Sequence, residues 1–377
     1  MLPPGVEPVN ERQRQMVAAL ESGDVDIVGA FGPSGTGKSF LTCLYGIKAV
    51  EDGKYSRFIV IRPLIDVNTG RRYTAVELGP LFFDIAASYL YDLTSGIFSD
   101  EEVKKLLDEG RVSLADPSFL AGRTFENALV FLDDVHYVLP EVIYESLLRI
   151  GRNAKLVIAG DPVFQAEGRV NGAALAREVL LGEDRTFVVD FRIADIVRPG
   201  ARRAFKLTLE MKLRRRSMSE EERKVMSLAY AHAPDAEIVT VVDLRGLKEK
   251  YRVRNVPDML LISKEGYLGR LIGRGGERIS RIEKESGYAL RGVELSLDLR
   301  ELISSIHPIG WIKKHVVNVD IVGVNLEVEV SSREFGAFVG QRGLFVRFLD
   351  EAIRSMLGVG VKARSVEVEE RRRRKRR

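Results

Sequence analysis

The stretch "DIVGAFGPSGTGKSFL", residues 26–41, decides the fold of the N-terminal half of this chain. Residues 24–31 form a short apolar run that predicts a buried strand, and residues 39–50 place apolar side chains at helical spacing. The loop between them fits the pattern G-x-x-x-x-G-K-[ST] at Gly32, Gly37, Lys38 and Ser39. A glycine loop that joins a strand to a helix in this way indicates a phosphate-binding loop.

The residue types of this loop suit a nucleoside triphosphate. Glycines let successive backbone N–H groups turn towards phosphate oxygens, and the helix N-terminus adds partial positive charge. We expect Lys38 to reach the β- and γ-phosphates and the Ser39 hydroxyl to bind Mg²⁺, so ATP and Mg²⁺ are the predicted cofactors. The bland alternative is a glycine-rich turn that binds no phosphate. The predicted nucleotide-binding loop residues are Gly32, Pro33, Ser34, Gly35, Thr36, Gly37, Lys38, Ser39 and Phe40.

An acidic pair follows a second apolar run in "NALVFLDDVHY", residues 127–137. Where that strand ends, Asp133 can hold the water shell of Mg²⁺ and Asp134 can orient the attacking water. A solvated carboxylate pair is the alternative, but the upstream loop favours the catalytic interpretation. A third strand over 154–161, "AKLVIAGD", is followed by Gln165. Strands that alternate with helices predict an α/β fold with a parallel sheet and a ligand at the carboxyl ends of its strands.

Several segments together resemble one known family. The segments "GPSGTGKS" (32–39), "GRTFENALVFLDD" (122–134), "LLRIGRNAKLVIAGDP" (147–162) and "DIVRPG" (195–200) are similar to successive motifs of PhoH-type ATPases, relatives of the first RecA-like domain of superfamily-one helicases. The resemblance covers about residues 5–200 and implies a RecA-like P-loop NTPase domain. It also implies that Gln13 reads the adenine, that Gln165 is catalytic, and that Arg149 and Arg198 are the family's two motif arginines.

The chain departs from that family in three places. The family's "DEAQ" is "DDVH" here, so Asp134 replaces a glutamate and His136 a glutamine. Gln165 lies one residue later than in the family's "GDPTQ", and the segment "RP…LGFLPGD" is reduced to Arg62-Pro63 and "ELGPL". Because aspartate is one methylene shorter than glutamate, we expect ATP binding more firmly than fast hydrolysis, with His136 as the next candidate base.

Charge is divided unevenly along the chain. Residues 1–200 hold 21 Lys and Arg against 29 Asp and Glu, whereas residues 201–377 hold 37 against 25. This asymmetry places any binding of a phosphate backbone in the C-terminal half. The chain shows no signal peptide and no apolar run of membrane-spanning length, and its single cysteine, Cys43, indicates a reducing compartment. We expect a cytoplasmic protein without a membrane partner.

Two small modules are expected after residue 200. "RAFKLTLEMKL", residues 203–213, alternates apolar and polar residues and predicts a half-buried strand, which with a basic linker fills 201–218. Ser219 and Glu222 have the spacing of a capping box and predict a helix. The elements that follow have the order α-β-β-α-α-β, with G-x-x-G between two helices at 273–276. The same pattern returns with G-x-x-G at 340–343.

Both modules resemble prokaryotic-type (type II) KH domains, and the pair is similar to the tandem KH module of the transcription factor NusA. By that resemblance 219–299 and 300–368 are α+β KH domains that bind single-stranded RNA, with DNA not excluded, and 369–377 is a basic tail. Nearby Arg270, Arg278 and Arg347 are expected to contact phosphates, while Ile272, Ile279 and Val339 either line the groove or are plain core. The predicted RNA-binding residues are Gly273, Arg274, Gly275, Gly276, Gly340, Gln341, Arg342 and Gly343.

The sequence therefore predicts an ATPase domain at 1–200 joined to RNA-binding modules, and with the resemblance we expect an archaeal source. ATP would drive the remodelling or timing of RNA binding. Only one P-loop is present, so a homo-oligomer, including a ring, would supply the second lobe, with Arg149 or Arg198 as an arginine finger in trans. The main alternative is an RNA-binding scaffold whose nucleotide site is a switch with little turnover. A small-molecule phosphotransferase is the third, for which no second substrate motif is present.

Overall fold

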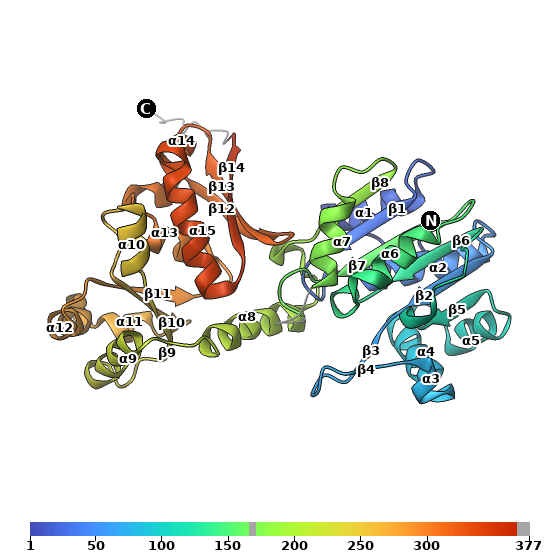
Figure 1. Cartoon of the computed structure of the whole chain (residues 1–377), viewed down its shortest axis with the longest axis horizontal. Coiled ribbons are helices and arrows are strands. Elements are labelled where there is room, and N and C mark those ends of the chain that lie inside the picture. The colour runs from blue at the N-terminus through green and yellow to red at the C-terminus, as the bar shows by residue number, and fades with distance from the viewer. Residues whose placement is uncertain (166–170, 368–377) are drawn as a thin grey trace, which may run out of the picture. The chain divides into compact units, whose positions relative to one another are not determined.

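The computed structural model describes residues 1–165 and 171–367, which form two compact units, Met1–Arg202 and Arg203–Arg377 (Figure 1). Each unit is described by itself. The expected basic tail, 369–377, lies outside the described residues.

The first unit is built on one six-stranded sheet in which all strand pairs are parallel, in the order β5-β2-β6-β7-β1-β8. This arrangement confirms the predicted α/β fold with a parallel sheet. The strands are β1 (Ile27–Phe31), β2 (Arg57–Ile61), β5 (Val112–Ala115), β6 (Ala128–Leu132), β7 (Lys155–Gly160) and β8 (Thr186–Asp190). The helices are α1 (Glu11–Glu21), α2 (Lys38–Glu51), α3 (Ala75–Leu78), α4 (Pro80–Thr94), α5 (Asp100–Asp108), α6 (Pro140–Leu148) and α7 (Gly172–Leu180).

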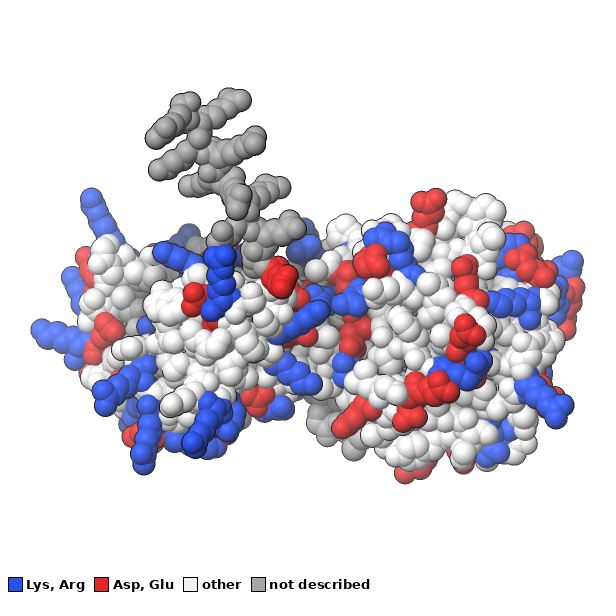
Figure 2. Space-filling view, turned by 90° about the horizontal axis from the view of Figure 1, so that it is seen from above, with Lys and Arg blue, Asp and Glu red and all other residues white. Residues whose placement is uncertain are grey.

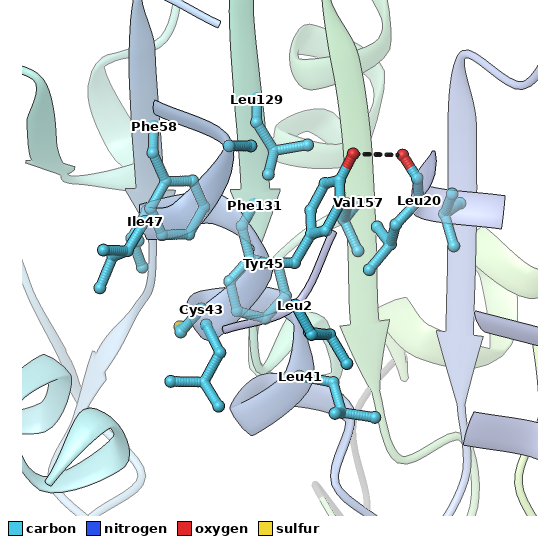
Figure 3. Close-up of a cluster of buried hydrophobic side chains, with 14 of the residues drawn as sticks. Leu2, Leu20, Leu41, Cys43, Tyr45, Ile47, Phe58, Leu129, Phe131 and Val157 are labelled. Atoms are coloured by element: carbon cyan, nitrogen blue, oxygen red, sulfur yellow. Dashed lines mark hydrogen bonds between the residues drawn. The ribbon is translucent and has the colours of Figure 1, made fainter. Parts of the chain in front are cut away.

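Both faces of this sheet are buried, which is why its strands are apolar without interruption. Val28 and Phe131 face a core shared with α1, α2, α4 and α5, while Ile158 and Val130 face a second core with α6 and α7. In the first core, the buried Tyr45 of α2 donates a hydrogen bond from its hydroxyl to the carbonyl oxygen of Leu20, 2.8 Å away (Figure 3). Full burial of a side chain such as Phe131 stabilises the fold by roughly 2–3 kcal/mol.

A long insertion separates β2 from β5. It contains the two-stranded hairpin of β3 (Leu64–Ile65) and β4 (Arg72–Tyr73), followed by α3, α4 and α5. Phe82, Ala86 and Leu90 of α4 are buried, so this helix is part of the core rather than a loose addition. No motif in the sequence predicts these elements.

The predicted strand over 203–213 is wrong: residues Pro199–Arg214 form the helix α8. Phe205, Leu209 and Leu213 are buried, whereas Leu207 is 48% exposed and Met211 61% exposed. The buried residues are four apart, which is helical spacing. Because every second residue of the segment is apolar, every fourth is apolar too, so the sequence fits both a strand and a helix. The segment is also rich in residues that favour helices over strands.

The second unit consists of two repeats, each with a three-stranded sheet. The middle strand of each sheet pairs antiparallel with the preceding strand and parallel with the following one. The first repeat contains α9 (Glu220–His232), β9 (Ile238–Asp243), α10 (Arg245–Tyr251), β10 (Met259–Lys264), α11 (Leu268–Ile272), α12 (Glu277–Ser286) and β11 (Leu290–Leu295). The second contains α13 (Arg300–Ile306), β12 (Val316–Val322), β13 (Asn325–Ser331), α14 (Phe335–Val339), α15 (Leu344–Leu357) and β14 (Gly360–Val366).

The second repeat follows the expected order α-β-β-α-α-β, and the first adds α10 between its first two strands. The capping box at the start of α9 is present, with Ser219 and Glu222 each bonded to the backbone of the other. The strand β11 begins three residues earlier than the segment "VELSLDL" indicates. Among the described residues, no helix has both the length and the apolar character needed to cross a bilayer.

Candidate nucleotide site and glycine loops

The P-loop leaves β1 at Gly32 and enters α2 at Lys38. The backbone of Gly32 has φ +139°, and a Cβ atom there would lie 2.3 Å from the carbonyl oxygen of Phe191, so only glycine fits. Gly37, the N-cap of α2, is left-handed and provides no side-chain cap. The N-terminus of α2 is therefore not covered by a capping side chain, as binding of an anion there requires.

Lys38 is folded into the loop that it follows. Its ammonium donates to the carbonyl oxygens of Gly32 at 2.8 Å and Pro33 at 2.7 Å and contacts the Thr36 hydroxyl at 3.2 Å. Burial lowers the pKa of Lys38, and the carboxylates of Asp161, Asp133 and Asp134 oppose that shift. A phosphate would replace backbone carbonyls with charged acceptors for this ammonium.

The first carboxylate of the acidic pair meets the P-loop directly. The hydroxyl of Ser39 donates to Oδ1 of Asp133 at 3.1 Å, although the two residues are 94 positions apart in the chain. The Tyr89 hydroxyl of α4 donates to the other oxygen, Oδ2. Burial raises the pKa of Asp133 to about 6, and the neighbouring Asp134 adds to the shift. A hydroxyl beside a carboxylate is a hard oxygen pair that fits Mg²⁺, so Ser39 and Asp133 are the residues that would hold it.

The second carboxylate, Asp134, is held by an arginine. Arg62, the first residue after β2, donates to Oδ2 of Asp134 from Nε at 3.0 Å and from Nη2 at 2.7 Å. The backbone of Asp134 is left-handed, at φ 50° and ψ 39°, a conformation that aspartate tolerates better than most residues. Strained residues of this kind concentrate at functional sites.

His136 cannot take the place of Asp134 as a base. Its Nδ1 accepts the backbone N–H of Asp161 at 3.2 Å, so in the neutral ring the proton sits on Nε2. Burial lowers the pKa of His136, with Asp134 as the main opposing influence, which favours the neutral form. Nε2 lies 3.9 Å from Oδ1 of Asp134 and has no hydrogen-bond partner among the described residues. The side chain thus presents a donor, not a lone pair, to the site.

These residues line one cavity of about 690 Å³, within the range of small-molecule sites. The predicted residues on its wall are Gln13, Gly32, Ser34, Gly35, Gly37, Lys38, Ser39, Phe40, Asp133, Asp134, Gln165 and Arg198. Pro33 and Thr36 support the loop from behind, and Arg149 pairs with Glu145 at the end of α6, outside the wall. The wall also includes residues with no motif to reveal them, namely Arg62, Tyr89, Asp92, Leu93 and Ser95.

Gln13 is the predicted adenine reader, and the backbone already uses both ends of its amide. The side-chain oxygen accepts from Val9 N at 2.8 Å, and Nε2 donates to the carbonyl of Thr36 at 2.9 Å. To read a base, Gln13 would have to release one of these bonds. Its role in adenine binding stays a prediction.

Comparisons with known proteins identify the family of this region. Residues 5–210 match the protein family described as PhoH-like protein, which is more than half of the chain. The chain belongs to the PhoH-like family. A PhoH-like protein of Bacillus subtilis is 28% identical over 188 residues, or 49% of this chain and 58% of the relative. Protein PhoH of Escherichia coli is 28% identical over 200 residues, or 50% of this chain and 54% of the relative. The chain therefore spans little more than half the length of these relatives.

Likeness to solved structures is weaker. A structure titled "Crystal structure of APE1850" matches 39% of this chain and 100% of its own length, at 21% identity and a TM-score of 0.28. The Pif1 helicase of Candida albicans matches 68% of this chain and 64% of its own, at 14% identity and a TM-score of 0.27. Scores this low support no conclusion about fold or function. The expected archaeal source also stays a prediction.

The two G-x-x-G loops lie beyond the PhoH-like match, and their backbones agree closely. Gly273 has φ 77° and ψ 173°, and Gly340 has φ 72° and ψ 169°. The third positions, Gly275 and Arg342, are both left-handed, at φ 62° and 53°. The fourth positions, Gly276 and Gly343, are left-handed N-caps of α12 and α15. The two loops are thus one structural motif used twice.

The variable positions of both loops face solvent. Arg274, Gly275, Gln341 and Arg342 are exposed, and the three with side chains make no side-chain hydrogen bond or ion pair within 1–165 and 171–367. Arg278 is already paired with Asp235.

Of the other predicted groove residues, some already contact neighbouring side chains or are half-buried. Arg270 stacks on Tyr267 at 4.6 Å, and Arg347 is exposed. Ile272, Ile279 and Val339 are half-buried, so both interpretations of these aliphatic side chains remain open.

Proposed function

We propose that this PhoH-like chain is an ATPase that binds single-stranded RNA and couples ATP binding and hydrolysis to the binding or remodelling of that RNA. The observation that carries the proposal is the meeting of Ser39 and Asp133 in one cavity with Lys38 and Asp134. These are the groups that phosphoryl transfer needs: a phosphate cradle, a cation, a Mg²⁺ pair and a base.

In this mechanism Lys38 neutralises charge on the β- and γ-phosphates, while Ser39 and Asp133 would hold Mg²⁺, which would supply charge stabilisation. Asp134 accepts the proton of the attacking water as the water oxygen bonds to the γ-phosphorus. The bond to the bridging oxygen breaks, and ADP and inorganic phosphate leave. The N–H of His136 can donate to an oxygen near Asp134 and orient it.

The RNA half of the proposal rests on the repeated loop. Two copies of one backbone motif each present exposed, unpaired positions to solvent, as a nucleic-acid clamp of the KH type requires. Lys and Arg side chains are frequent on the surface of the second unit (Figure 2). Residues 201–377 carry 37 Lys and Arg against 25 Asp and Glu, so attraction to phosphates is expected.

We also propose that the chain acts in the cytoplasm as a homo-oligomer, with a ring as one form. Arg198 lies on the wall of its own cavity, whereas Arg149 lies outside it. If Arg149 serves as an arginine finger, it must therefore reach the nucleotide of a neighbouring copy.

A second function, a nucleotide-dependent switch with little turnover, is favoured by one contact. Asp134, the proposed base, is ion-paired with Arg62, which occupies one of its two carboxylate oxygens. In that case ATP and ADP would set two states of RNA binding without rapid hydrolysis.

Steady-state ATP hydrolysis, titrated with single-stranded RNA, tests the proposal. Wild type should hydrolyse ATP and be stimulated by RNA, and Lys38→Ala should lose turnover. Replacing Arg274, Gly275, Gln341 and Arg342 with Asp should abolish RNA stimulation and leave the basal rate unchanged, because four carboxylates would then face the RNA backbone. RNA and DNA oligomers of the same sequence identify the preferred strand.

The control is Arg252→Asp with Arg254→Asp, two exposed positions of the first repeat outside its loop, of which Arg252 is also left-handed. It lowers the net charge by 4, against 6 for the fourfold loop variant, and should keep stimulation. RNA binding without any turnover would establish the switch instead. Undiminished RNA binding by the fourfold loop variant would overturn the RNA-binding role of the loops.

A further inference from the structure

The cavity contains a cation, Arg62, that belongs neither to the P-loop nor to the acidic pair. Arg62 reaches it from the end of β2, while the P-loop reaches it from β1, three places further along the sheet. Its guanidinium makes two hydrogen bonds to the same oxygen of Asp134, and its central carbon lies 3.7 Å from the centroid of the Tyr89 ring. The side chains of Arg62 and Asp134 are each 28% exposed, so the pair is only partly shielded from ligands in the cavity.

This ion pair restrains the proposed base. A carboxylate oxygen that accepts two bonds from a guanidinium is held in a charge-assisted pair, which must open before that oxygen can contact another group. The second oxygen of Asp134 faces the Nε2 of His136, which carries a proton in the neutral ring. The ion pair therefore occupies one oxygen of Asp134 and leaves the other without a hydrogen bond to His136.

The only ligand expected in this cavity brings a stronger partner for Arg62. A guanidinium binds the oxygens of a phosphate in the same bidentate manner as those of a carboxylate. The terminal phosphate of a triphosphate carries most of the added negative charge, and it must lie near Lys38 and Ser39, which share the cavity wall with Arg62. A diphosphate lacks that group.

We propose that Arg62 is a sensor of the third phosphate, which draws its guanidinium away from Asp134 only when a triphosphate is bound. This inference rests on the proposed ATPase function and deepens it. Because Arg62 also stacks on Tyr89, and Tyr89 bonds to Asp133, the exchange is transmitted to α4 of the insertion.

Binding affinities without turnover test the sensor. Calorimetric titrations with Mg²⁺ and either ADP or the non-hydrolysable analogue AMP-PNP are compared for wild type and Arg62→Gln. The variant should lose about tenfold or more in affinity for AMP-PNP and change less than about twofold for ADP, because a charge-assisted bond to the third phosphate is lost. Arg57→Gln is the matched control, since Arg57 begins the same strand and is exposed. It should alter neither affinity.

A double-mutant cycle with Asp134→Asn separates sensing from simple charge repulsion. If Arg62 must leave Asp134, Asp134→Asn should tighten AMP-PNP binding several-fold in the presence of Arg62, and the gain should vanish in the Arg62→Gln background. A gain of equal size in both backgrounds would mean plain repulsion and overturn the sensor.

Equal losses for ADP and AMP-PNP in Arg62→Gln would show a merely structural role and also overturn it, while the ATPase proposal would stand. A wild type that binds neither nucleotide would remove both proposals.

Discussion

In the P-loop a Cβ atom on Gly32 would lie 2.3 Å from a backbone oxygen, whereas a Cβ atom on Gly276 or Gly343 would have no atom within 4 Å. The two kinds of glycine loop thus serve different needs. The P-loop is pressed against β8 and the start of α8, since Gly35 would meet Ala201 at 2.4 Å. The last glycine of each G-x-x-G loop, Gly276 or Gly343, is half-buried but has free space around its Cβ position, so glycine is needed there only for the left-handed backbone. A glycine of the P-loop therefore indicates close packing, whereas the last glycine of a G-x-x-G loop indicates a left-handed turn.

The largest effect that follows is on Gly32. Gly32→Ala combines a forbidden φ with a clash against the backbone at Phe191, so we expect a loss of roughly 3–5 kcal/mol in stability of the first unit. Nucleotide affinity should fall by more than about a hundredfold, because the loop can no longer follow β1 in its present path. Thermal denaturation and titration with a fluorescent ATP analogue measure both. A variant as stable as wild type would show that close packing does not require glycine at position 32.

The G-x-x-G loops contain one position of each kind, which sharpens the comparison. Gly340, at φ 72° and ψ 169°, lies in a region that only glycine populates, and its Cβ would be 2.6 Å from the ring of Phe345. We expect Gly340→Ala to cost about 2–4 kcal/mol and Gly343→Ala only about 1–2 kcal/mol. Trp311 is the only tryptophan and lies in the second repeat, so its fluorescence during urea unfolding reports this repeat. Equal costs at the two positions would contradict the distinction.

The parts of the site that the sequence predicted share one property: their pattern is local. Gly32 to Ser39 and the acidic pair each follow an apolar strand, and parallel strands place such ends at one edge. Arg62 also follows an apolar strand, β2, but Tyr89 carries no such pattern, because it meets Asp133 across 44 positions from a helix inside an insertion. Contacts of that range depend on how α4 packs, which no spacing in the sequence encodes.

The fold of the linker shows a different limit. Apolar residues at every second position also occupy every fourth, so residues 203–213 satisfied a strand and a helix pattern together. The exposed Leu207 and Met211 decided against the strand only once the burial of each side chain was known. By contrast, the G-x-x-G loops were predictable because glycine itself marks their left-handed turns. The hydrogen bonds of the Gln13 side chain were not predictable, since its partners at Val9 and Thr36 are backbone groups.

A smaller effect is the dependence of the stability of the second repeat on pH. His307 is buried, bonds through Nε2 to the carbonyl of Phe338 at 3.0 Å and stacks on its ring, just before Gly340. Burial lowers the pKa of His307, so below about pH 6.5 the unfolded chain takes up a proton before the folded repeat does. The free energy of unfolding of the second repeat should therefore be highest above that pH. Below it, this free energy should fall by at most about 1.4 kcal/mol for each pH unit.

Urea unfolding followed at Trp311 between pH 7 and 5 measures this loss. His307→Gln removes the titrating group and should flatten the profile, whatever its effect at pH 7. A slope that persists in His307→Gln would assign the acid sensitivity to other residues.

The smallest effect concerns the third position of the two G-x-x-G loops, where the residue types differ although the backbones agree. Arg342 occupies the left-handed position that Gly275 fills in the first loop, at φ 53° against 62°. Because a residue with a side chain pays about 1 kcal/mol or more for this conformation, Arg342→Gly should stabilise the second repeat by about 1 kcal/mol in urea unfolding. The reciprocal Gly275→Arg has free space for its Cβ and should destabilise the first repeat by a similar amount. If the arginine is retained for phosphate contact, Arg342→Gly should also weaken RNA binding and Gly275→Arg strengthen it, so that stability and affinity move in opposite directions. Affinity that follows stability in both variants would mean that Arg342 contributes only to the fold.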